Sequence, residues 1–510
     1  MSRSFYITTA IDYVNGKPHL GHAYEKIGTD VIARWRRLMG DDVFFLTGTD
    51  EHGSKVEKTA KAAGLSPKEF TDSLIPAFKD AWAALDIAYD RFIRTTDPDH
   101  AVAAVALLER LRDAGHLFEK EYEGWYCDGC EAYKTDKDLV DGKCPDHKSL
   151  EARWLKEKNL HFRLSSFQDQ LLAHYEAHPD FVVPEFRKNE VLSLIRGGLL
   201  DVSVSRSNRS VSWGLDIPFR PDSVIYVWFE ALINYLTGAG FGSDEGTFSE
   251  RWPAVHVLGK DVTRFHCVLW PAMLMAADIP LPEQIFAHGW VLQSGEKMSK
   301  TSGTGVEPLA MAQRYGADPV RFYLVSQVQW GKDGEFTWER FENTYDAFLA
   351  NKYGNLLSRS LSMAVKYFGE VPDAPADAHL QQLCAEVVDA ASSAYDRLQI
   401  TDGVNAAWRI VTECNDLIQA REPWVMAKDP ERREELASFI YGLLEAGRIV
   451  TALLSPVMPG KCAAAQDALG CASDREVTGP ELFAWGGLQP GAPLSKPKPL
   501  FPRLDQLLAQ

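Results

Sequence analysis

Two histidines near the N-terminus are spaced to bind phosphate. The motif His19-Leu-Gly-His22 follows a β-rich run at residues 5–11 and begins a segment of helical periodicity that runs to Met39. Backbone N–H groups at a helix N-terminus attract phosphate oxygens, and two imidazoles beside them add further donors. Gly21 has no side chain, so a planar base or a sugar can approach the backbone closely there. A pair of histidines with structural roles at a helix start is the alternative interpretation.

A second group of residues suits phosphate chemistry from a mobile loop. Lys297-Met-Ser-Lys300-Thr301 follows an expected strand at residues 285–292 and a Ser-Gly turn. Two ammonium groups three residues apart can clamp a polyphosphate while its charge redistributes, and such a loop tightens when substrate binds. Taken alone, the motif is better explained by two solvated lysines.

Four further side chains have the spacing of metal ligands. Cys127-x-x-Cys130 and Cys144-x-x-His147 are separated by 13 residues. Two such knuckles predict a closed tetrahedral zinc site, which has no open position and is therefore structural. Free thiols or disulfides are the alternatives. The other cysteines lack this spacing and are expected in the core: Cys267, Cys384, Cys414, Cys462 and Cys471.

The motifs need elements that bring them together. Strand–helix–strand order in residues 1–114, and again in 222–290, predicts one parallel α/β sheet interrupted by an insertion at 115–221. A nucleotide should bind at the carboxyl edge of such a sheet. Residues 291–345 carry the lysine motif, and 346–510 have the long apolar-periodic runs of a helix bundle.

Length and composition are those of a multi-domain globular protein. The chain has 510 residues and a net charge of -17, from 54 Lys+Arg against 71 Asp+Glu. At roughly 100–200 residues per domain this length predicts about three domains. No apolar run is long enough to cross a membrane, and no signal peptide is visible. Eight cysteines without a secretion signal indicate a reducing compartment, so a cytoplasmic location is expected. The acidic balance disfavours non-specific nucleic-acid binding but allows a specific partner.

The two phosphate motifs together, in this order, resemble the HIGH and KMSKS elements of the class I aminoacyl-tRNA synthetases. Leu20 replaces Ile and Thr301 replaces the last Ser, and both changes keep the chemistry of the position. Within that class the chain resembles the methionyl-tRNA synthetases over about residues 5–460. Four more segments carry this likeness: Ala10-Ile-Asp-Tyr-Val-Asn-Gly16, Gly48-Thr-Asp-Glu-His-Gly53, Tyr226-Val-Trp-Phe-Glu-Ala-Leu-Ile-Asn-Tyr235 and Ala287-His-Gly-Trp290.

The resemblance implies a fold and a reaction. The expected fold is a Rossmann-like catalytic domain split by a zinc-knuckle insertion, followed by a stem-contact region and an all-α anticodon-binding bundle. The expected reaction is activation of methionine by ATP and its transfer to the 3′ end of tRNA, with Mg²⁺ assisting. Catalysis is then assigned to His19, His22, Lys297 and Lys300. The implied ATP-binding residues are His19, Gly21, His22, Gly259, Lys260, Asp261 and Lys300.

A methionine site should be apolar and aromatic, because the side chain is long and polarisable with only a weak acceptor. Trp228 and Tyr235 are seven residues apart and are expected on one face of one helix. Asp50, at the end of a strand, suits the substrate ammonium group. The remaining expected contacts are Ala10, Ile11 and Tyr13, on a facing strand end, and His288, near the thioether. Ordinary core packing is the alternative for the two aromatic residues.

The helical C-terminal part has one polar stripe. Asn351, Asn355 and Arg359 recur at four-residue intervals, and Trp424 follows in an Arg-Glu-Pro-Trp segment. Amides and a guanidinium can hydrogen-bond unstacked bases, and an exposed tryptophan can stack one. By the resemblance, these residues read the CAU anticodon. A solvated helix face and a core tryptophan are the alternative.

Other functions are less compatible with these features. Isoleucine, valine and leucine enzymes of the class carry larger editing insertions, and a cysteine enzyme would use zinc in its catalytic pocket. An inactive relative that only binds tRNA should have lost the motif residues. A small-molecule nucleotidyltransferase would have no use for the bundle. The expected partners are ATP, L-methionine and both initiator and elongator tRNA(Met), and the chain is expected to be monomeric.

Overall fold

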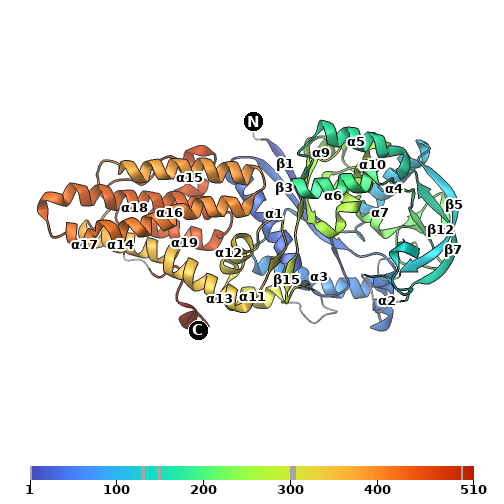
Figure 1. Ribbon diagram of the computed structural model, residues 1–510, viewed down its shortest axis with the longest axis horizontal. Helices are drawn as coiled ribbons and strands as arrows, with labels where there is room; N and C mark the ends of the chain where they lie inside the picture. Colours follow the sequence, from blue (N-terminus) through green and yellow to red (C-terminus); the bar gives the residue numbers. More distant parts are fainter. Residues whose placement is uncertain are drawn as a thin grey trace.

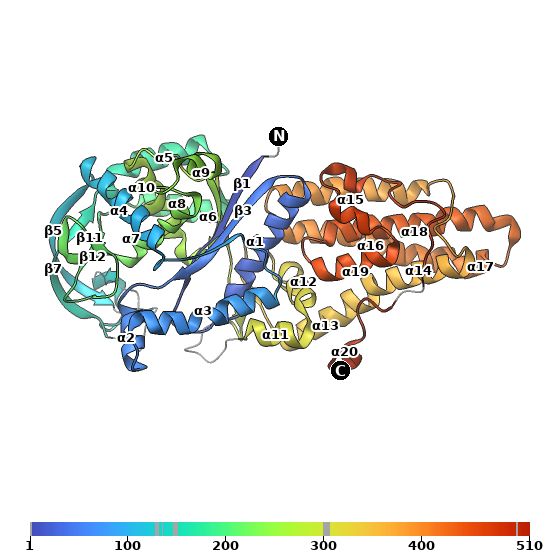
Figure 2. The same ribbon diagram turned by 180° about the vertical axis from the view of Figure 1, so that it is seen from behind.

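The computed structural model describes residues 3–127, 132–134, 136–145, 151–298, 306–495 and 498–509. The molecule is elongated, with a sheet-containing half at one end and a helix bundle at the other (Figures 1 and 2). Helix α1 (Leu20–Leu38) lies between the central sheet and the bundle. The phosphate motif at its start therefore sits on an element that contacts both halves.

The main sheet is parallel throughout and joins two distant parts of the sequence. Its strand order is β2-β3-β1-β13-β14-β8, with β4 also pairing with β3. This confirms the predicted parallel α/β fold, and it puts the first strand in the middle of the sheet. The strands are β1 (Ser4–Thr9), β2 (Asp12–Tyr13), β3 (Asp42–Asp50), β4 (Arg91–Arg94), β8 (Val182–Val183), β13 (Ala254–Gly259) and β14 (Gln284–His288).

Successive residues of the central strand pack against different layers. Phe5 and Ile7 of β1 belong to one apolar core with α1, α3 (Pro67–Ala84) and the bundle, whereas Tyr6 belongs to a second core. The second core also contains α4 (Pro98–Asp113), α8 (Asn234–Ala239) and α10 (Trp270–Ala276). Helices thus cover both faces, as a parallel sheet requires.

The segment between the two halves forms antiparallel sheets of its own. Its four-stranded sheet has the order β6-β5-β7-β9 and a smaller one has the order β10-β12-β11. β8, however, comes from within the predicted insertion and pairs with β14 of the main sheet. The exact domain boundaries stay a prediction. The elements are β5 (Leu117–Cys127), β6 (Ala132–Lys134), β7 (Arg153–Phe162), α5 (Gln168–Ala177), α6 (Glu185–Arg196), β9 (Val202–Ser203), β10 (Ser205–Ser207), β11 (Asp216–Ile217) and β12 (Arg220–Ile225).

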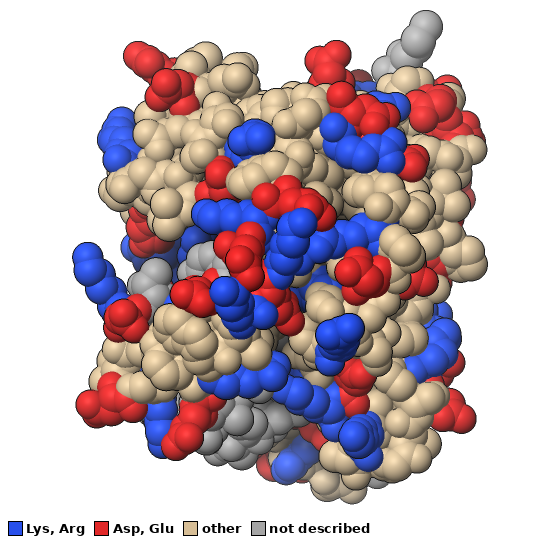
Figure 3. Space-filling view, turned by 90° about the vertical axis from the view of Figure 1, so that its right-hand side faces the viewer, with Lys and Arg blue, Asp and Glu red and all other residues tan. Residues whose placement is uncertain are grey.

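The face at this end of the molecule carries charges of both signs. Figure 3 shows Lys and Arg side chains interleaved with Asp and Glu, rather than gathered in one basic patch. In the insertion, Glu119 forms ion pairs with both Lys158 and Arg220. Mixed charge of this kind provides little general attraction for nucleic acid, in keeping with the acidic composition.

The C-terminal half is helical, as predicted. The connecting region contains a small sheet, of β15 (Val291–Gln293), β16 (Glu296–Lys297) and β17 (Gly334–Glu335), and three helices, α11 (Pro308–Tyr315), α12 (Ala317–Gln327) and α13 (Trp338–Thr344). The bundle helices are α14 (Asn355–Tyr367), α15 (Ala378–Asp396), α16 (Ile400–Arg421), α17 (Pro423–Met426), α18 (Arg433–Leu454) and α19 (Pro459–Leu469), with α20 (Leu504–Leu508) after them.

Helix α18 is the centre of the bundle. Within the described residues, one helical stretch, Pro430–Leu454, is long and apolar enough to cross a membrane, but 89% of its most apolar window is buried by the rest of the protein. It packs against α14, α15, α16 and α19 (Figure 1). A bundle's central helix is expected to be apolar on all sides for this reason.

Candidate active site

A cavity of about 240 Å³ opens where the main strands end and α1 begins. It lies at the carboxyl edge of the sheet, where an open parallel α/β fold binds its ligands. The structure brings together here most of the residues that the sequence singled out. They are Ala10, Ile11, Tyr13, His19, Gly21, His22, Asp50, Trp228, Tyr235, Gly259, Asp261 and His288.

The two motif histidines form the start of α1. His19 is the N-cap, and its Nδ1 accepts the Gly21 N–H at 3.1 Å, while His22 Nδ1 accepts the His19 N–H at 3.1 Å. The ring centroids are 3.8 Å apart. Because each Nδ1 accepts, the proton of each neutral ring is on Nε2. Both imidazoles are thereby oriented as Nε2–H donors at a helix N-terminus, which suits phosphate oxygens.

Trp228 and Tyr235 both line the cavity, but they are not on one helix. Trp228 is on α7 (Val227–Ala231) and Tyr235 is on α8. The prediction of a single helix is wrong because the chain turns between them, where the Asn234 side-chain amide donates to the Ala231 carbonyl at 2.5 Å. Asparagine competes with the backbone in this way and interrupts helices.

Two residues that the sequence analysis did not assign support this wall. The rings of Trp228 and Phe265 are stacked, with centroids 4.6 Å apart and planes 5° apart. Tyr235 Oη lies 2.7 Å from His266 Nε2, and His266 Nδ1 lies 3.1 Å from the Val262 carbonyl. Phe265 begins a π-helical turn, Phe265–Leu269, which follows the Gly-Lys-Asp segment. Sequence periodicity contains no signal for such a turn.

The Tyr235–His266 pair is uncharged at neutral pH. Burial lowers the pKa of His266 to about 4, although the Val262 carbonyl opposes this shift. Burial also raises the pKa of Tyr235. His266 therefore donates from Nδ1 to the Val262 carbonyl and accepts the Tyr235 hydroxyl proton at Nε2. The wall is aromatic and neutral, with one hydroxyl as its polar group.

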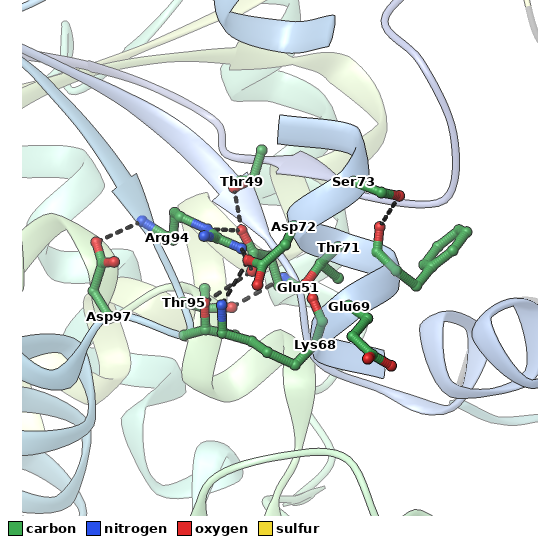
Figure 4. A network of polar contacts seen from close by, with 12 residues as sticks. Thr49, Glu51, Lys68, Glu69, Thr71, Asp72, Ser73, Arg94, Thr95 and Asp97 are labelled. Atoms are coloured by element: carbon green, nitrogen blue, oxygen red, sulfur yellow. Dashed lines mark hydrogen bonds and ion pairs between the residues drawn. The ribbon is translucent and has the colours of Figure 1, made fainter. Parts of the chain in front are cut away.

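Asp50 ends β3 in the cavity and is 4% exposed. The residue after it is held rigidly: Arg94 donates to both Glu51 oxygens, at 2.6 and 2.7 Å, and Thr49 and Thr96 hydroxyls add bonds of 2.8 Å each (Figure 4). This carboxylate has its acceptor sites filled. Glu51 therefore anchors the strand end that positions Asp50.

The next residue of the same segment is tied to α7. His52 Nδ1 lies 2.8 Å from Glu230 Oε1, and Glu230 is fully buried two residues after Trp228. Burial would lower the pKa of His52, but the Glu230 carboxylate outweighs it and raises that pKa. The pair connects the strand that carries Asp50 with the helix that carries Trp228.

The nucleotide side of the cavity is formed by the end of β13. A Cβ on Gly259 would lie 2.7 Å from Asp261 Oδ1, so a side chain at this position would force the Asp261 carboxylate to move. Asp261 Oδ1 accepts from Trp290 Nε1 at 3.2 Å. Lys260 differs from the prediction in its surroundings: its ammonium lies 2.6 Å from Asp333 and 4.0 Å from the Trp290 ring centroid.

His288 lines the cavity but has a different environment from the one expected. Its Nε2 lies 2.9 Å from Glu25 Oε2, and its Nδ1 lies 2.7 Å from the Gly289 carbonyl. Its ring stacks on Trp330, with centroids 5.3 Å apart. The predicted contact of His288 with the thioether stays a prediction, and His266 is the histidine bonded to Tyr235.

Comparison with known proteins agrees with this geometry. Residues 5–155 and 146–361 match the family described as tRNA synthetases class I (M). The chain is 42% identical to the methionine--tRNA ligases of Caldanaerobacter subterraneus subsp. tengcongensis, over 99% of this chain and 80% of that protein, and of Streptomyces coelicolor, over 99% and 97%. This chain belongs to the methionyl-tRNA synthetases of class I.

Solved structures of the family superpose closely. Mycobacterium tuberculosis methionyl-tRNA synthetase in complex with methionyl-adenylate is 41% identical, with a TM-score of 0.92 over 99% of this chain and 100% of that one. The apo form of the same enzyme has a TM-score of 0.85 at 38% identity, over 99% and 98%. The fold described above is thus more similar to the adenylate complex than to the free form.

The family's lysine motif is described only in part. Met298 is buried and lines the cavity, and Lys297 ends β16. The Lys297 side chain, Lys300 and Thr301 lie outside the described residues. The motif backbone thus reaches the cavity, and the lysine roles stay predictions.

The expected zinc ligands are also described in part. Cys127 ends β5 and Cys144 follows a turn, and both are buried. Cys130 and His147 lie outside the described residues. Among the described residues, no group of three or more His, Cys, Asp or Glu side chains is arranged to hold a metal. Two buried thiols at these positions suit a site of soft ligands.

The expected anticodon-reading residues lie in the bundle, far from the cavity along the molecule (Figure 1). Asn351 is exposed in a π-helical turn, Tyr345–Gly354, whereas Asn355 and Arg359 are half-buried on α14. A π-helical turn contains more residues than an α-helical turn, so a four-residue spacing does not put Asn351 on the same face as Asn355 and Arg359. The Arg359 guanidinium lies 5.9 Å from the half-buried Trp424 ring, so the structure brings these two together.

Proposed function

We propose that this chain ligates methionine to tRNA(Met) in two steps. Methionine is first activated by ATP, giving methionyl-adenylate and pyrophosphate, and the methionyl group is then transferred to the 3′ terminal adenosine of the tRNA. One observation carries the proposal. A single cavity joins an aromatic, uncharged wall to a helix N-terminus bearing two Nε2–H imidazoles.

The aromatic wall provides the amino-acid selectivity. Trp228, stacked on Phe265, offers a flat apolar surface, and the Tyr235 hydroxyl is held by His266. A thioether is polarisable and accepts hydrogen bonds only weakly, so it loses little on entering such a wall. Asp50 is assigned to the substrate ammonium, because a carboxylate at the strand end provides a charge-assisted partner.

The first step is an in-line attack by the methionine carboxylate on the α-phosphorus of ATP, with pyrophosphate leaving. Positioning and charge stabilisation dominate such reactions. His19 and His22 donate to phosphate oxygens at the start of α1, and Lys297 and Lys300 stabilise the leaving pyrophosphate. Gly259, Lys260 and Asp261 hold the nucleotide. Mg²⁺ bound with ATP neutralises phosphate charge. In the second step the terminal ribose hydroxyl attacks the mixed anhydride and AMP leaves.

A structural zinc ion is assigned to Cys127, Cys130, Cys144 and His147. The support is the spacing of the four ligands and the burial of the two thiols that the structure describes. Metal analysis of the purified protein should give one zinc per chain, and Cys144→Ser should lose it. A full-length protein without zinc that is folded and active would contradict this assignment.

Recognition of the anticodon, in both initiator and elongator tRNA(Met), is assigned to four residues of the bundle: Asn351, Asn355, Arg359 and Trp424. The Arg359–Trp424 contact supports this, because a guanidinium beside a ring offers stacking and hydrogen bonding at one place. The protein is proposed to act as a cytoplasmic monomer.

The experiment that tests the proposal is amino-acid-dependent exchange of pyrophosphate into ATP, with each of the twenty amino acids and no tRNA. Exchange with methionine alone is the expected result. Exchange with another amino acid would support amino-acid activation but contradict the assignment of the aromatic wall to methionine. If folded protein shows no pyrophosphate exchange with any of the twenty amino acids, the proposed activity is wrong.

A further inference from the structure

Lys26 is a fully buried cation whose three donors are all used. Its Nζ lies 2.6 Å from Asp12 Oδ1, 2.9 Å from Glu25 Oε1 and 3.1 Å from the Ala10 carbonyl oxygen. An ammonium group has three N–H donors, so these contacts satisfy it completely. The family motif residues do not include Lys26, and it does not itself line the cavity.

The partners of Lys26 form two different walls of the cavity. Ala10 and Asp12 belong to the strand end that also presents Ile11 and Tyr13. Glu25 faces the opposite way through its second oxygen, Oε2, which lies 2.9 Å from His288 Nε2 at the end of β14.

His288 is itself held from both sides. Its ring stacks on Trp330, and the edge contact with Tyr24 has a centroid distance of 5.4 Å. Through Glu25, the Lys26 ammonium therefore links the Ala10–Asp12 strand end of the first half of the split sheet to His288 of the second half.

Stability alone is a weak reason for a charge at this place. Burying two carboxylates and an ammonium costs desolvation energy that their attraction roughly repays, and well-packed apolar residues usually do as well or better. What the cluster provides instead is geometry, because three hydrogen bonds tie the attached groups to one buried ammonium. Side chains that hold a site to within about 0.5 Å matter for rate, since misplacement by about 1 Å can cost roughly 100-fold.

We propose that Lys26 is a positioning residue for methionine activation. It holds the Ala10–Asp12 strand end and the Glu25–His288 pair at a fixed separation. The amino-acid side and the nucleotide side of the cavity therefore keep a fixed position relative to each other. The inference rests on the proposed function and adds to it a residue that acts through its neighbours.

The test compares Lys26→Met with a charge-matched double variant in the full chain. The cluster of Asp12, Glu25 and Lys26 carries a formal charge of −1; Lys26→Met makes it −2, and adding Asp12→Asn restores −1. Lys26→Met should lower kcat/KM for methionine in pyrophosphate exchange by at least roughly 10-fold. The double variant should regain Tm but not kcat/KM. Recovery of both would show that only charge balance matters and would overturn the proposal.

A second measurement is a double-mutant cycle with His288→Asn. Among the described contacts, Lys26 and His288 are linked through Glu25. If the three act as a unit, the losses in kcat/KM are not additive, whereas independent structural effects add. Additive losses would overturn the proposal.

Arg448→Met is the matched control, because it removes a buried cation from the bundle. It should lower Tm without changing kcat/KM for exchange. Wild-type exchange with methionine separates the two claims: its absence would overturn the proposed function together with this inference, whereas wild-type exchange with an unaffected Lys26→Met overturns the role of Lys26 alone.

Discussion

The molecule contains two buried cation clusters that look alike and do different things. Lys26, beside the cavity, and Arg448, in the bundle, are both almost completely buried, and each pairs with a neighbouring carboxylate on its own helix. Arg448 also donates to the Leu482 and Ala484 carbonyls, and its partner Glu445 accepts three backbone N–H groups, those of Gly486, Gly487 and Leu488.

The difference lies in what the partners of each cation are. In the bundle, besides Glu445, they are the Asp474 carboxylate and the Leu482 and Ala484 carbonyls of the C-terminal segment, so the cluster fastens that segment to α18. At the sheet edge they are groups that line a ligand cavity. Burial and charge alone therefore do not distinguish a structural cluster from a positioning one, and the neighbours of the partners do.

The largest expected effect is on the bundle cluster. Glu445→Ala removes the closer carboxylate of the buried Arg448, at 2.7 Å, while Asp474 remains at 3.1 Å, and it also removes the acceptor of three N–H groups. This should cost about 3–5 kcal/mol of the free energy of unfolding. Denaturant unfolding measures this loss. Pyrophosphate exchange per folded molecule should be unchanged. A fall in kcat/KM for methionine as large as the loss of stability would show that the two clusters do not differ in function.

The next largest effect is a loss of catalytic rate with little loss of stability. His22→Ala removes an Nε2–H donor at the start of α1 and should lower kcat for pyrophosphate exchange by about 10²–10³-fold. The lost capping bond should cost only about 1 kcal/mol of stability. His174→Ala, on the distant helix α5, is the control and should leave the rate unchanged. Equal rates for the two variants would remove His22 from the mechanism.

Acid should destabilise the catalytic half through His266. Its folded pKa of about 4 lies below the ordinary value of 6.5, so between these pH values the unfolded chain binds a proton that the folded chain does not. Stability therefore falls as pH falls through this window, by about 3 kcal/mol from this group. His266→Gln should flatten the dependence of unfolding free energy on pH between 6.5 and 4. An unchanged slope would show that His266 is not buried in its neutral form.

The smallest expected effect concerns the bundle and tRNA, and it separates charging of tRNA from activation of methionine. Trp424→Ala should leave pyrophosphate exchange unchanged and weaken charging of tRNA(Met), with a loss of about 1–3 kcal/mol in kcat/KM for tRNA if the ring stacks a base. Val425→Ala, at an exposed neighbouring position, is the control for general damage to α17. An equal fall in exchange and charging would make Trp424 a core residue.

Much of the fold and of the site follows from local sequence. The β-rich runs and the helix starts predict a split parallel sheet, and motif residues placed after strands must meet at its carboxyl edge. His19, His22, Asp50 and Asp261 are found there together. The aromatic residues Trp228 and Tyr235 also meet at the cavity, although through two short helices rather than one.

Other parts of the site have no local signal. His266 lines the cavity and Phe265 stacks on Trp228, both from a π-helical turn, and the usual helical period cannot place them. Lys26 follows a carboxylate on an ordinary amphipathic helix, where a solvated face is the natural expectation. Glu51 directly follows the functional candidate Asp50, but its carboxylate is paired with Arg94, 43 residues away.

The sequence by itself determined which residues could do the chemistry and which edge of the sheet would collect them, because strand and helix periods and the position of each motif after a strand are local properties. Only the tertiary structure decided which charged groups are buried against one another. Long-range partners such as Glu25 with His288, 263 residues apart, depend on how the layers pack, and burial turns an ordinary ion pair into one with a single arrangement.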